Sequence, residues 1–304
     1  MTAILYDVPG PKAVRRNRVL AVVTVVVVVA IIGAIVYRFA LSGQFSAAKW
    51  QVFTYTTVWV QIAQALGKTL AAFAAAAVLS MVFGFVLAIG RLSDHAWVRR
   101  PVLVITEVCR AVPVLVMMML LYYGLPSVGI RMDPYWAVVL ALMVYNGSVI
   151  AETIRAGVEA LPKGQAEAGY SIGLRKNGVM RLILLPQAIR AMLPVLVAQL
   201  VVTMKDTALG FIITYPELLY LAKLMSSSPG RPLLQSAFVI GGIYIVLCII
   251  LSACASLVER RMRQSHARVT AGGADEPDPR QHDRPVTEVL AVQYLEDERD
   301  RDRS

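Results

Sequence analysis

Long apolar stretches alternate with short polar segments along the whole first part of the chain. A helix needs roughly 20 mostly apolar residues to cross the hydrocarbon core of a bilayer, and helices in soluble cores usually run shorter. The pattern therefore predicts an all-α membrane protein with six spans. The predicted spans are Val19–Phe39, Ala65–Gly90, Val102–Leu125, Tyr135–Val158, Ile189–Ile213 and Leu233–Val258.

The lysine and arginine residues between the spans predict an orientation. With a cytoplasmic N-terminus, the inner segments carry most of these residues, which is the usual bias of cytoplasmic loops. The outer segments then carry only Lys49, Arg131, Lys223 and Arg231. We therefore expect a multi-pass protein of the plasma membrane with both termini, and the loop over residues 160–188, in the cytoplasm.

Four segments outside the spans have characters of their own. Residues 1–18 are basic and are expected to lie in the cytoplasm. The apolar run that follows could also be the core of a signal peptide, but it is longer than such a core usually is. Residues 42–64 are rich in aromatic side chains and are expected to lie along the outer membrane interface. Residues 215–225 predict a short amphipathic helix, and residues 265–304 predict a disordered cytoplasmic tail.

Composition and charge narrow the function. Of 304 residues, 57% are hydrophobic and 16% charged, with a net charge of +10, but the basic residues flank the spans instead of lining a face for nucleic acid. The sequence contains no phosphate-binding GxxxxGK[ST] loop and no GxSxG nucleophile motif. The histidines and cysteines lack ligand spacing. We expect no catalytic residues, no metal, no cofactor and no nucleic-acid partner; membrane lipid is the expected surrounding.

Ionisable and helix-weakening residues inside spans are the candidate solute path, because charge in a bilayer is costly. Pro113 and the step Asn146-Gly147-Ser148 are expected to break two helices and free backbone groups. Paired opposite charges suit a zwitterionic solute, although they also fit simple ties between helices. The candidate residues are Arg110, Asn146, Glu152, Lys205 and Asp206.

The polar loop between the fourth and fifth spans carries the most specific motif. "EAGYSIGLRKNGVMRLILLP", residues 167–186, resembles the EAA loop of ABC-type importer permeases, whose form is E-A-A, three residues, G, nine residues and I-x-L-P. Gly169 stands where the motif has its second Ala. The match extends over roughly residues 65–260, and segments such as "CRAVPVLV" are similar to the branch for polar amino acids. The segment "LYDVPGPKAVRRNR", residues 5–18, resembles actinobacterial glutamate-uptake permeases in particular.

The resemblance implies a function and partners. It implies a five-helix permease domain over residues 65–264, with the helix over residues 19–41 as an N-terminal addition. Separate ABC ATPase subunits would dock on the loop, an extracytoplasmic amino-acid-binding protein would deliver the solute, and a second permease, identical or different, would complete the path. The residues implied in ATPase coupling are Gln165, Glu167, Ala168, Gly169, Gly173, Arg175, Ile183, Leu185 and Pro186.

The sequence departs from the family pattern at one point, and two alternative functions are open. Ala111, Val112 and Met117 are apolar where the branch has Gly, Thr and Gln, so a second, different permease is expected to supply more of the binding site. An ion-coupled secondary amino acid transporter would need no ATPase and usually shows paired broken helices. A structural subunit of a membrane complex would tolerate neutral substitutions at Arg110 and Glu152.

Overall fold

The computed structural model describes residues 10–227 and 232–271, with side chains described as far as Leu257, and every regular element in these ranges is helical. Contacts divide the chain into unit 1, Met1–Ser252, and unit 2, Ala253–Ser304. The long helices of unit 1 are α1 (Pro11–Leu41), α3 (Thr56–Arg91), α4 (Ala96–Ala111), α6 (Pro134–Glu159), α9 (Leu185–Asp206) and α11 (Leu233–Ala271), the last of which continues into unit 2.

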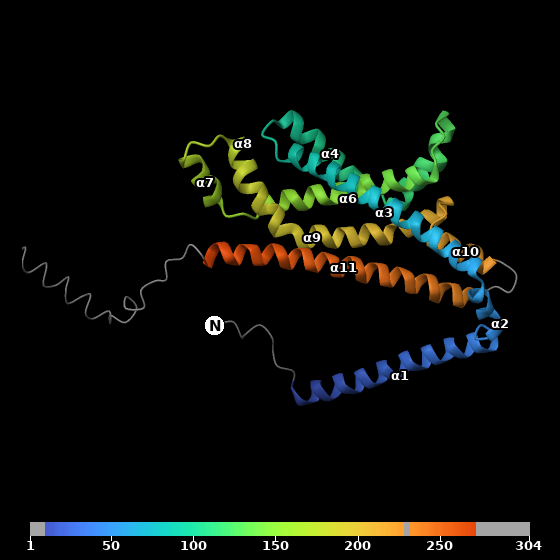
Figure 1. The fold of residues 1–304 in the computed structure, drawn as a ribbon. Coiled ribbons are helices and arrows are strands. Elements are labelled where there is room, and N and C mark those ends of the chain that lie inside the picture. The colour runs from blue at the N-terminus through green and yellow to red at the C-terminus, as the bar shows by residue number, and fades with distance from the viewer. Residues whose placement is uncertain (1–9, 228–231, 272–304) are drawn as a thin grey trace, which may run out of the picture. The chain divides into compact units, whose positions relative to one another are not determined.

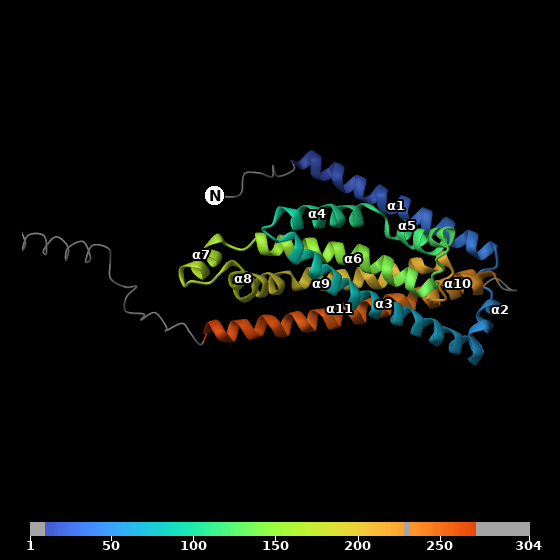
Figure 2. The same ribbon diagram turned by 90° about the horizontal axis from the view of Figure 1, so that it is seen from above.

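Shorter elements connect these helices. They are α2 (Ala47–Trp50), η1 (Gln51–Thr54), α5 (Val114–Met119), η2 (Leu120–Gly124), η3 (Leu125–Val128), α7 (Lys163–Ser171), α8 (Lys176–Val179), η4 (Met180–Leu184), η5 (Thr207–Ile213) and α10 (Leu218–Ser227). Figures 1 and 2 both show α6 beside α9, with α7 and α8 together at one end of these helices and α10 near the other. We call the end with α7 and α8 the loop end, and the end near α10 the opposite end.

The predicted spans are present, with changed boundaries. Within the described residues, five helices are long and apolar enough to cross a membrane, and the pair α4 with α5–η3 supplies a sixth if it counts as one bent span. The second span begins at Thr56, so the predicted interfacial segment ends nine residues earlier than expected. Helix α11 runs to Ala271, so residues 265–271 are helical, and the remainder of the predicted tail lies outside the described residues.

One predicted helix break is correct and the other is wrong. The pair α4 and α5 is bent by 95° at Val112 and Pro113, as expected of a proline that cannot donate a backbone hydrogen bond. Helix α6, in contrast, is continuous through residues 146–148. The Asn146 amide donates to the Leu142 carbonyl oxygen at 3.1 Å, and neighbouring helices cover this stretch on α6, so packing outweighs weak helix propensity here.

Helices α3 and α6 form the most extensive helix pair of the fold. At their closest approach Gly84 faces Gly147: a methyl group added at Gly84 would lie 2.6 Å from the Gly147 carbonyl oxygen. The Ser80 hydroxyl donates across the same contact to the Leu142 carbonyl oxygen at 3.3 Å. Small residues let membrane helices pack closely when lipid supplies no hydrophobic driving force between them. This glycine contact therefore fixes the spacing of α3 and α6.

The opposite end is held by a buried carboxylate. Glu217, fully buried, accepts from the backbone N–H groups of Leu219 at 2.8 Å and Tyr220 at 2.7 Å, and from the Tyr244 hydroxyl at 2.5 Å. The two backbone bonds satisfy donors at the start of α10 that have no partner within that helix. These three hydrogen bonds offset the free-energy cost of burying the carboxylate. The bond from Tyr244, which lies on α11, also ties the start of α10 to α11.

We predict that Gly84→Ala lowers the free energy of unfolding by about 1–3 kcal/mol, because the new methyl group meets the backbone carbonyl oxygen of Gly147 and the base of the Ile150 side chain. The matched control is Gly241→Ala, since Gly241 also lies inside a helix but has nothing within 4 Å of an added methyl group. Unfolding titrations of the purified protein in mixed micelles measure both. Equal stability of the two variants would contradict the close contact.

Candidate functional site

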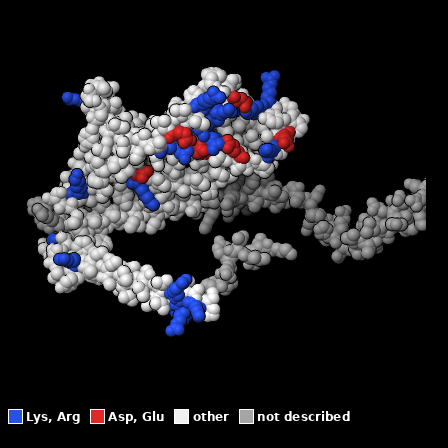
Figure 3. Space-filling model, turned by 180° about the vertical axis from the view of Figure 1, so that it is seen from behind, with Lys and Arg blue, Asp and Glu red and all other residues white. Residues whose placement is uncertain are grey.

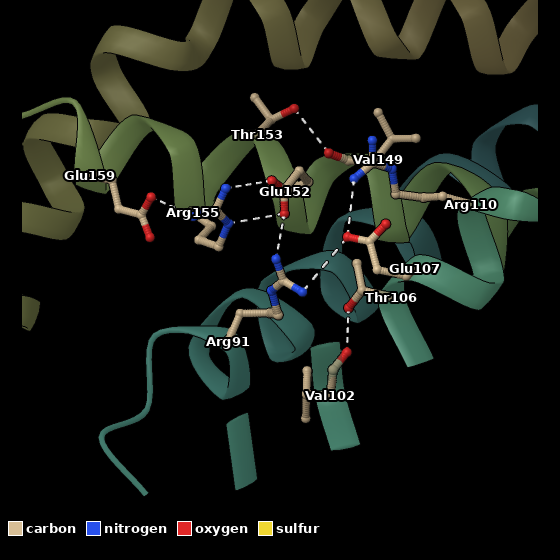
Figure 4. Close-up of polar contacts among 10 residues, drawn as sticks. All are labelled: Arg91, Val102, Thr106, Glu107, Arg110, Val149, Glu152, Thr153, Arg155 and Glu159. Atoms are coloured by element: carbon tan, nitrogen blue, oxygen red, sulfur yellow. Dashed lines mark hydrogen bonds and ion pairs between the residues drawn. The ribbon is translucent and has the colours of Figure 1, made fainter. Parts of the chain in front are cut away.

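Six charged side chains gather where α3, α4 and α6 meet, toward the loop end (Figure 4). Arg91 is the last residue of α3; Glu107 and Arg110 lie on α4; Glu152, Arg155 and Glu159 lie on α6. Figure 3 shows blue and red side chains crowded together on one region of unit 1, while most of the visible surface is uncharged. The six residues carry three positive and three negative charges, so the cluster is neutral as a whole.

Arg91 is the centre of this cluster. Its side chain is only 7% exposed, its Nη2 donates to Glu152 Oε2 at 3.1 Å, and its Nη1 lies 3.9 Å from Glu107 Oε1. Arg155 also binds Glu152, from Nη2 to Oε1 at 2.5 Å and from Nε to Oε2 at 3.0 Å, and pairs with Glu159. The carboxylate of Glu152 is thus held by two guanidinium groups, one of them buried.

A pocket of about 350 Å³ lies beside the cluster, between α4 and α6, and is lined by Glu107, Arg110, Ala111, Tyr145 and Val149. Arg110 Nη1 and Glu107 Oε1 are 3.9 Å apart, so this pair is loose, and the two side chains are 38% and 56% exposed. Because the two side chains hold each other weakly, Arg110 is free to bind the carboxylate of a zwitterion and Glu107 its ammonium group. The pocket has the size and charge for a small amino acid.

The other predicted path residues lie elsewhere. Asn146 is fully buried, and its Oδ1 accepts from Gln199 Nε2 at 2.7 Å, which ties α6 to α9. Lys205 and Asp206 end α9, which begins at Leu185 near the loop end, so a rise of about 30 Å separates them from that end. The structure therefore brings Arg110 and Glu152 into one cluster but not Asn146, Lys205 or Asp206.

The loop over residues 163–186 folds into compact helices. Helix α7 ends at Ser171, and Gly173 follows with φ of 83°, a left-handed conformation that favours glycine. Gln187 Nε2, on α9, donates to Gln165 Oε1, on α7, at 3.1 Å. The stretch from Lys176 to Ile213 is one helical run that includes Arg181, Ile183, Leu185 and Pro186. The loop is thus packed on the base of α9.

Gly169 permits this packing, which explains the departure from the motif. A methyl group at position 169 would lie 2.8 Å from Ile183 Cδ1 and 2.8 Å from Val179 Cγ2. Val179 is fully buried and its two γ carbons fill the space where an alanine side chain would project. The glycine is therefore matched by the branched side chains that face it.

The outer face of α7 and the turn after it are exposed, including Glu167, Ala168 and Arg175. Tyr170 and Ile172 are 47% and 76% exposed. Lys176 pairs with Asp94 in the connection between α3 and α4, and the hydrogen bond from Lys176 holds the pKa of Asp94 below its usual range. Because the pKa is lowered, this link is present at neutral pH and is lost only as the pH falls through the acidic range.

Two polar residues that join helices are absent from the predicted set, Arg91 in the charge cluster and Gln199 beside Asn146. The predicted second span ends at Gly90, which leaves Arg91 in the loop that follows, yet its side chain turns back into the core to reach Glu152. Gln199, the partner of Asn146, was not singled out. A polar residue inside a long apolar helix is itself a signal for an interhelical hydrogen bond, and Gln199 carries that signal.

Comparison with known proteins agrees with this fold. Residues 80–264 match the family model described as "Binding-protein-dependent transport system inner membrane component". The chain is 39% identical over 243 residues to the glutamate transport system permease protein GluD of Corynebacterium glutamicum, covering 78% of this chain and 89% of that one. It is 32% identical over 211 residues to the glutamine transport system permease protein GlnP of Escherichia coli K12, covering 68% and 90%.

A solved structure has the same fold. A crystal structure of an amino acid ABC transporter with histidines superposes with a TM-score of 0.64 and 30% identity, covering 70% of this chain and 97% of that one. The chain belongs to the family of inner membrane components of binding-protein-dependent transport systems. It is a multi-pass membrane permease of the ABC importer class, a transport subunit that is not itself catalytic.

We predict that Glu152→Gln destabilises the fold by about 3 kcal/mol, because it leaves the buried Arg91 guanidinium without its close carboxylate. Glu159→Gln is the matched control: Glu159 pairs with the same Arg155 but is 59% exposed, so its loss costs less than about 1 kcal/mol. Unfolding titrations in mixed micelles check this order. A control as destabilising as Glu152→Gln would refute the role given to Arg91.

Proposed function

We propose that this chain is the permease subunit through which an ATP-driven importer moves a polar amino acid into the cell, with glutamate as the cargo. The observation that carries the proposal is the folded loop on the base of α9, because a connector has no need of a packed helix pair with an exposed apolar face. The relatives named for glutamate and glutamine transport support the class of cargo. The basic loop end is the cytoplasmic end in this proposal.

The loop is proposed as the contact for separate ATPase subunits. Tyr170 and Ile172 offer exposed apolar surface, and Glu167, at the middle of α7, offers a charge beside it. Loop movement would pass along two routes. In the first route, the helical run from Lys176 to Ile213 would transmit the movement to Gln199, which is hydrogen-bonded to Asn146 on α6. In the second, the Lys176–Asp94 pair would transmit it to the connection before α4.

The solute path is proposed at the pocket beside Glu107 and Arg110. Arg110 would bind the carboxylate of the amino acid and Glu107 its ammonium, while Arg91 and Glu152 hold the wall behind them. The rest of the path, and contacts to the side chain of the solute, would come from a second permease that lies beside this one in the membrane. An extracytoplasmic binding protein would supply the solute, which membership of a family of binding-protein-dependent transport systems supports.

We expect Gly173→Val to impair coupling while the subunit still inserts and assembles. A branched residue is strained at φ of 83°, so α7 would shift relative to α8. Uptake per ATP hydrolysed, measured in vesicles with the complete complex, should fall. Gly164→Ala is the control in the same loop, because an added methyl group there has nothing within 4 Å. An unchanged ratio in the Gly173 variant would refute the coupling role.

For the pocket, Arg110→Gln should raise the KM for labelled glutamate about tenfold or more, as the loss of a charged hydrogen bond to a carboxylate predicts. ATP hydrolysis without solute should stay unchanged. Uptake kinetics over a range of glutamate concentrations measure this, with Arg131→Gln, an exposed residue at the opposite end, as the control. If the control variant raised KM as much, or if glutamine but not glutamate were imported, the proposed site or the proposed cargo would be wrong.

A further inference from the structure

A cavity of about 860 Å³ opens at the opposite end of unit 1 and has no part in the function proposed above. It lies between the first half of α3, the start of α6 and the turn before α10. The lining residues that matter here are Gln64, Lys68, Ala71, Asp133, Tyr135 and Tyr215.

Hydrogen bonds and ring contacts hold the walls of this cavity in place. The Tyr215 hydroxyl donates to the Lys68 carbonyl oxygen at 2.8 Å, which joins the turn to α3. The Tyr215 ring lies 6.1 Å from the ring of Tyr135 at the start of α6. Asp133 Oδ1 accepts from the Tyr135 backbone N–H at 2.8 Å and so caps α6. The cavity is therefore a built feature of three segments.

Its walls carry two unlike charges, Lys68 and Asp133. The ion pairs of the described residues do not join these two side chains. Both residues are exposed to the cavity mouth. A ligand with a negative and a positive group separated by a few bonds can satisfy both, whereas a purely anionic ligand would meet Asp133 unfavourably.

The position of Lys68 on α3 places the cavity about one bilayer thickness from Arg91. On α3, the rise from Lys68 to Arg91 is about 35 Å, slightly more than the roughly 30 Å hydrocarbon core of a bilayer. With Arg91 near one boundary, Lys68 lies near the other. Trp136, 49% exposed, follows Tyr135 at this level, as aromatic side chains do in the interfacial belts of membrane proteins.

Below the cavity, the same face of α3 is apolar and exposed. Val78, Val82, Val86 and Ile89 follow Lys68 at helical spacing and are 62%, 58%, 60% and 53% exposed. This stripe runs from the cavity toward the loop end. A charged recess above an apolar stripe has the two parts that bind a phospholipid: a site for the headgroup and a surface for an acyl chain.

We propose that this cavity binds the headgroup of a zwitterionic phospholipid, phosphatidylethanolamine, from the outer leaflet. The phosphate lies at Lys68, the ammonium at Asp133, and one acyl chain follows the apolar stripe of α3. The inference uses the proposed orientation of the chain but neither the proposed cargo nor the coupling loop. The site would anchor the start of α6 and the turn before α10 to the membrane surface.

Native mass spectrometry of the purified complex, titrated with phosphatidylethanolamine, tests this proposal. Lys68→Gln and Asp133→Asn should each weaken its binding about fivefold, since one charge near a lipid surface contributes about 1 kcal/mol. Asparagine caps helices as well as aspartate, so Asp133→Asn removes the charge and keeps the fold. Lys49→Gln, which removes another charge outside the cavity, should bind lipid as the unchanged protein does.

Three results would overturn the proposal. Equal binding of phosphatidylethanolamine by all variants would show that the cavity does not hold the headgroup. Equal or tighter binding of phosphatidylglycerol, which has no ammonium, would remove the role of Asp133. Displacement of the lipid by free glutamate or glutamine would assign the cavity to the transported solute. None of these three results depends on the transport rate of the wild-type complex. The proposed function is therefore tested separately.

Discussion

The close approach of α3 and α6 is the constraint on which the rest of the core depends. With Gly84 opposite Gly147, the two backbones lie near enough for Ser80 to donate to a carbonyl oxygen of α6, and the same spacing brings Arg91 at the end of α3 within 3.1 Å of Glu152. A larger residue at the crossing would move Arg91 away from its partner. Packing of small residues thus positions the charge cluster.

That cluster links the pocket to the loop. Arg91 joins α3 to α6 and approaches α4, whose Arg110 lines the pocket, while the connection after Arg91 contains Asp94, the partner of Lys176. The pocket wall and the loop are therefore attached to the same end of α3. In a membrane, an unpaired buried charge is costly, so the cluster favours movement of α3, α4 and α6 as one body.

Much of the fold could be predicted from the sequence, because the length of an apolar run and the residues that form a turn are local signals. The six spans, the bend at Pro113 and the left-handed Gly173 all follow from short windows of sequence. The continuity of α6 through Asn146 does not, because it depends on Gln199 and Gly84, which are distant in sequence. The role of Arg91 depends on the fold for the same reason: the predicted span ends at Gly90, and only the fold decides whether an arginine at that end points to water or to Glu152.

The central claim is that this permease works in an ATP-driven importer. The most direct test reconstitutes the complete complex in vesicles and measures accumulation of labelled glutamate with ATP and binding protein supplied, in the presence and absence of a protonophore. We predict accumulation that requires ATP and is unaffected by the protonophore. Accumulation driven by a proton gradient without ATP, and abolished by the protonophore, would contradict it.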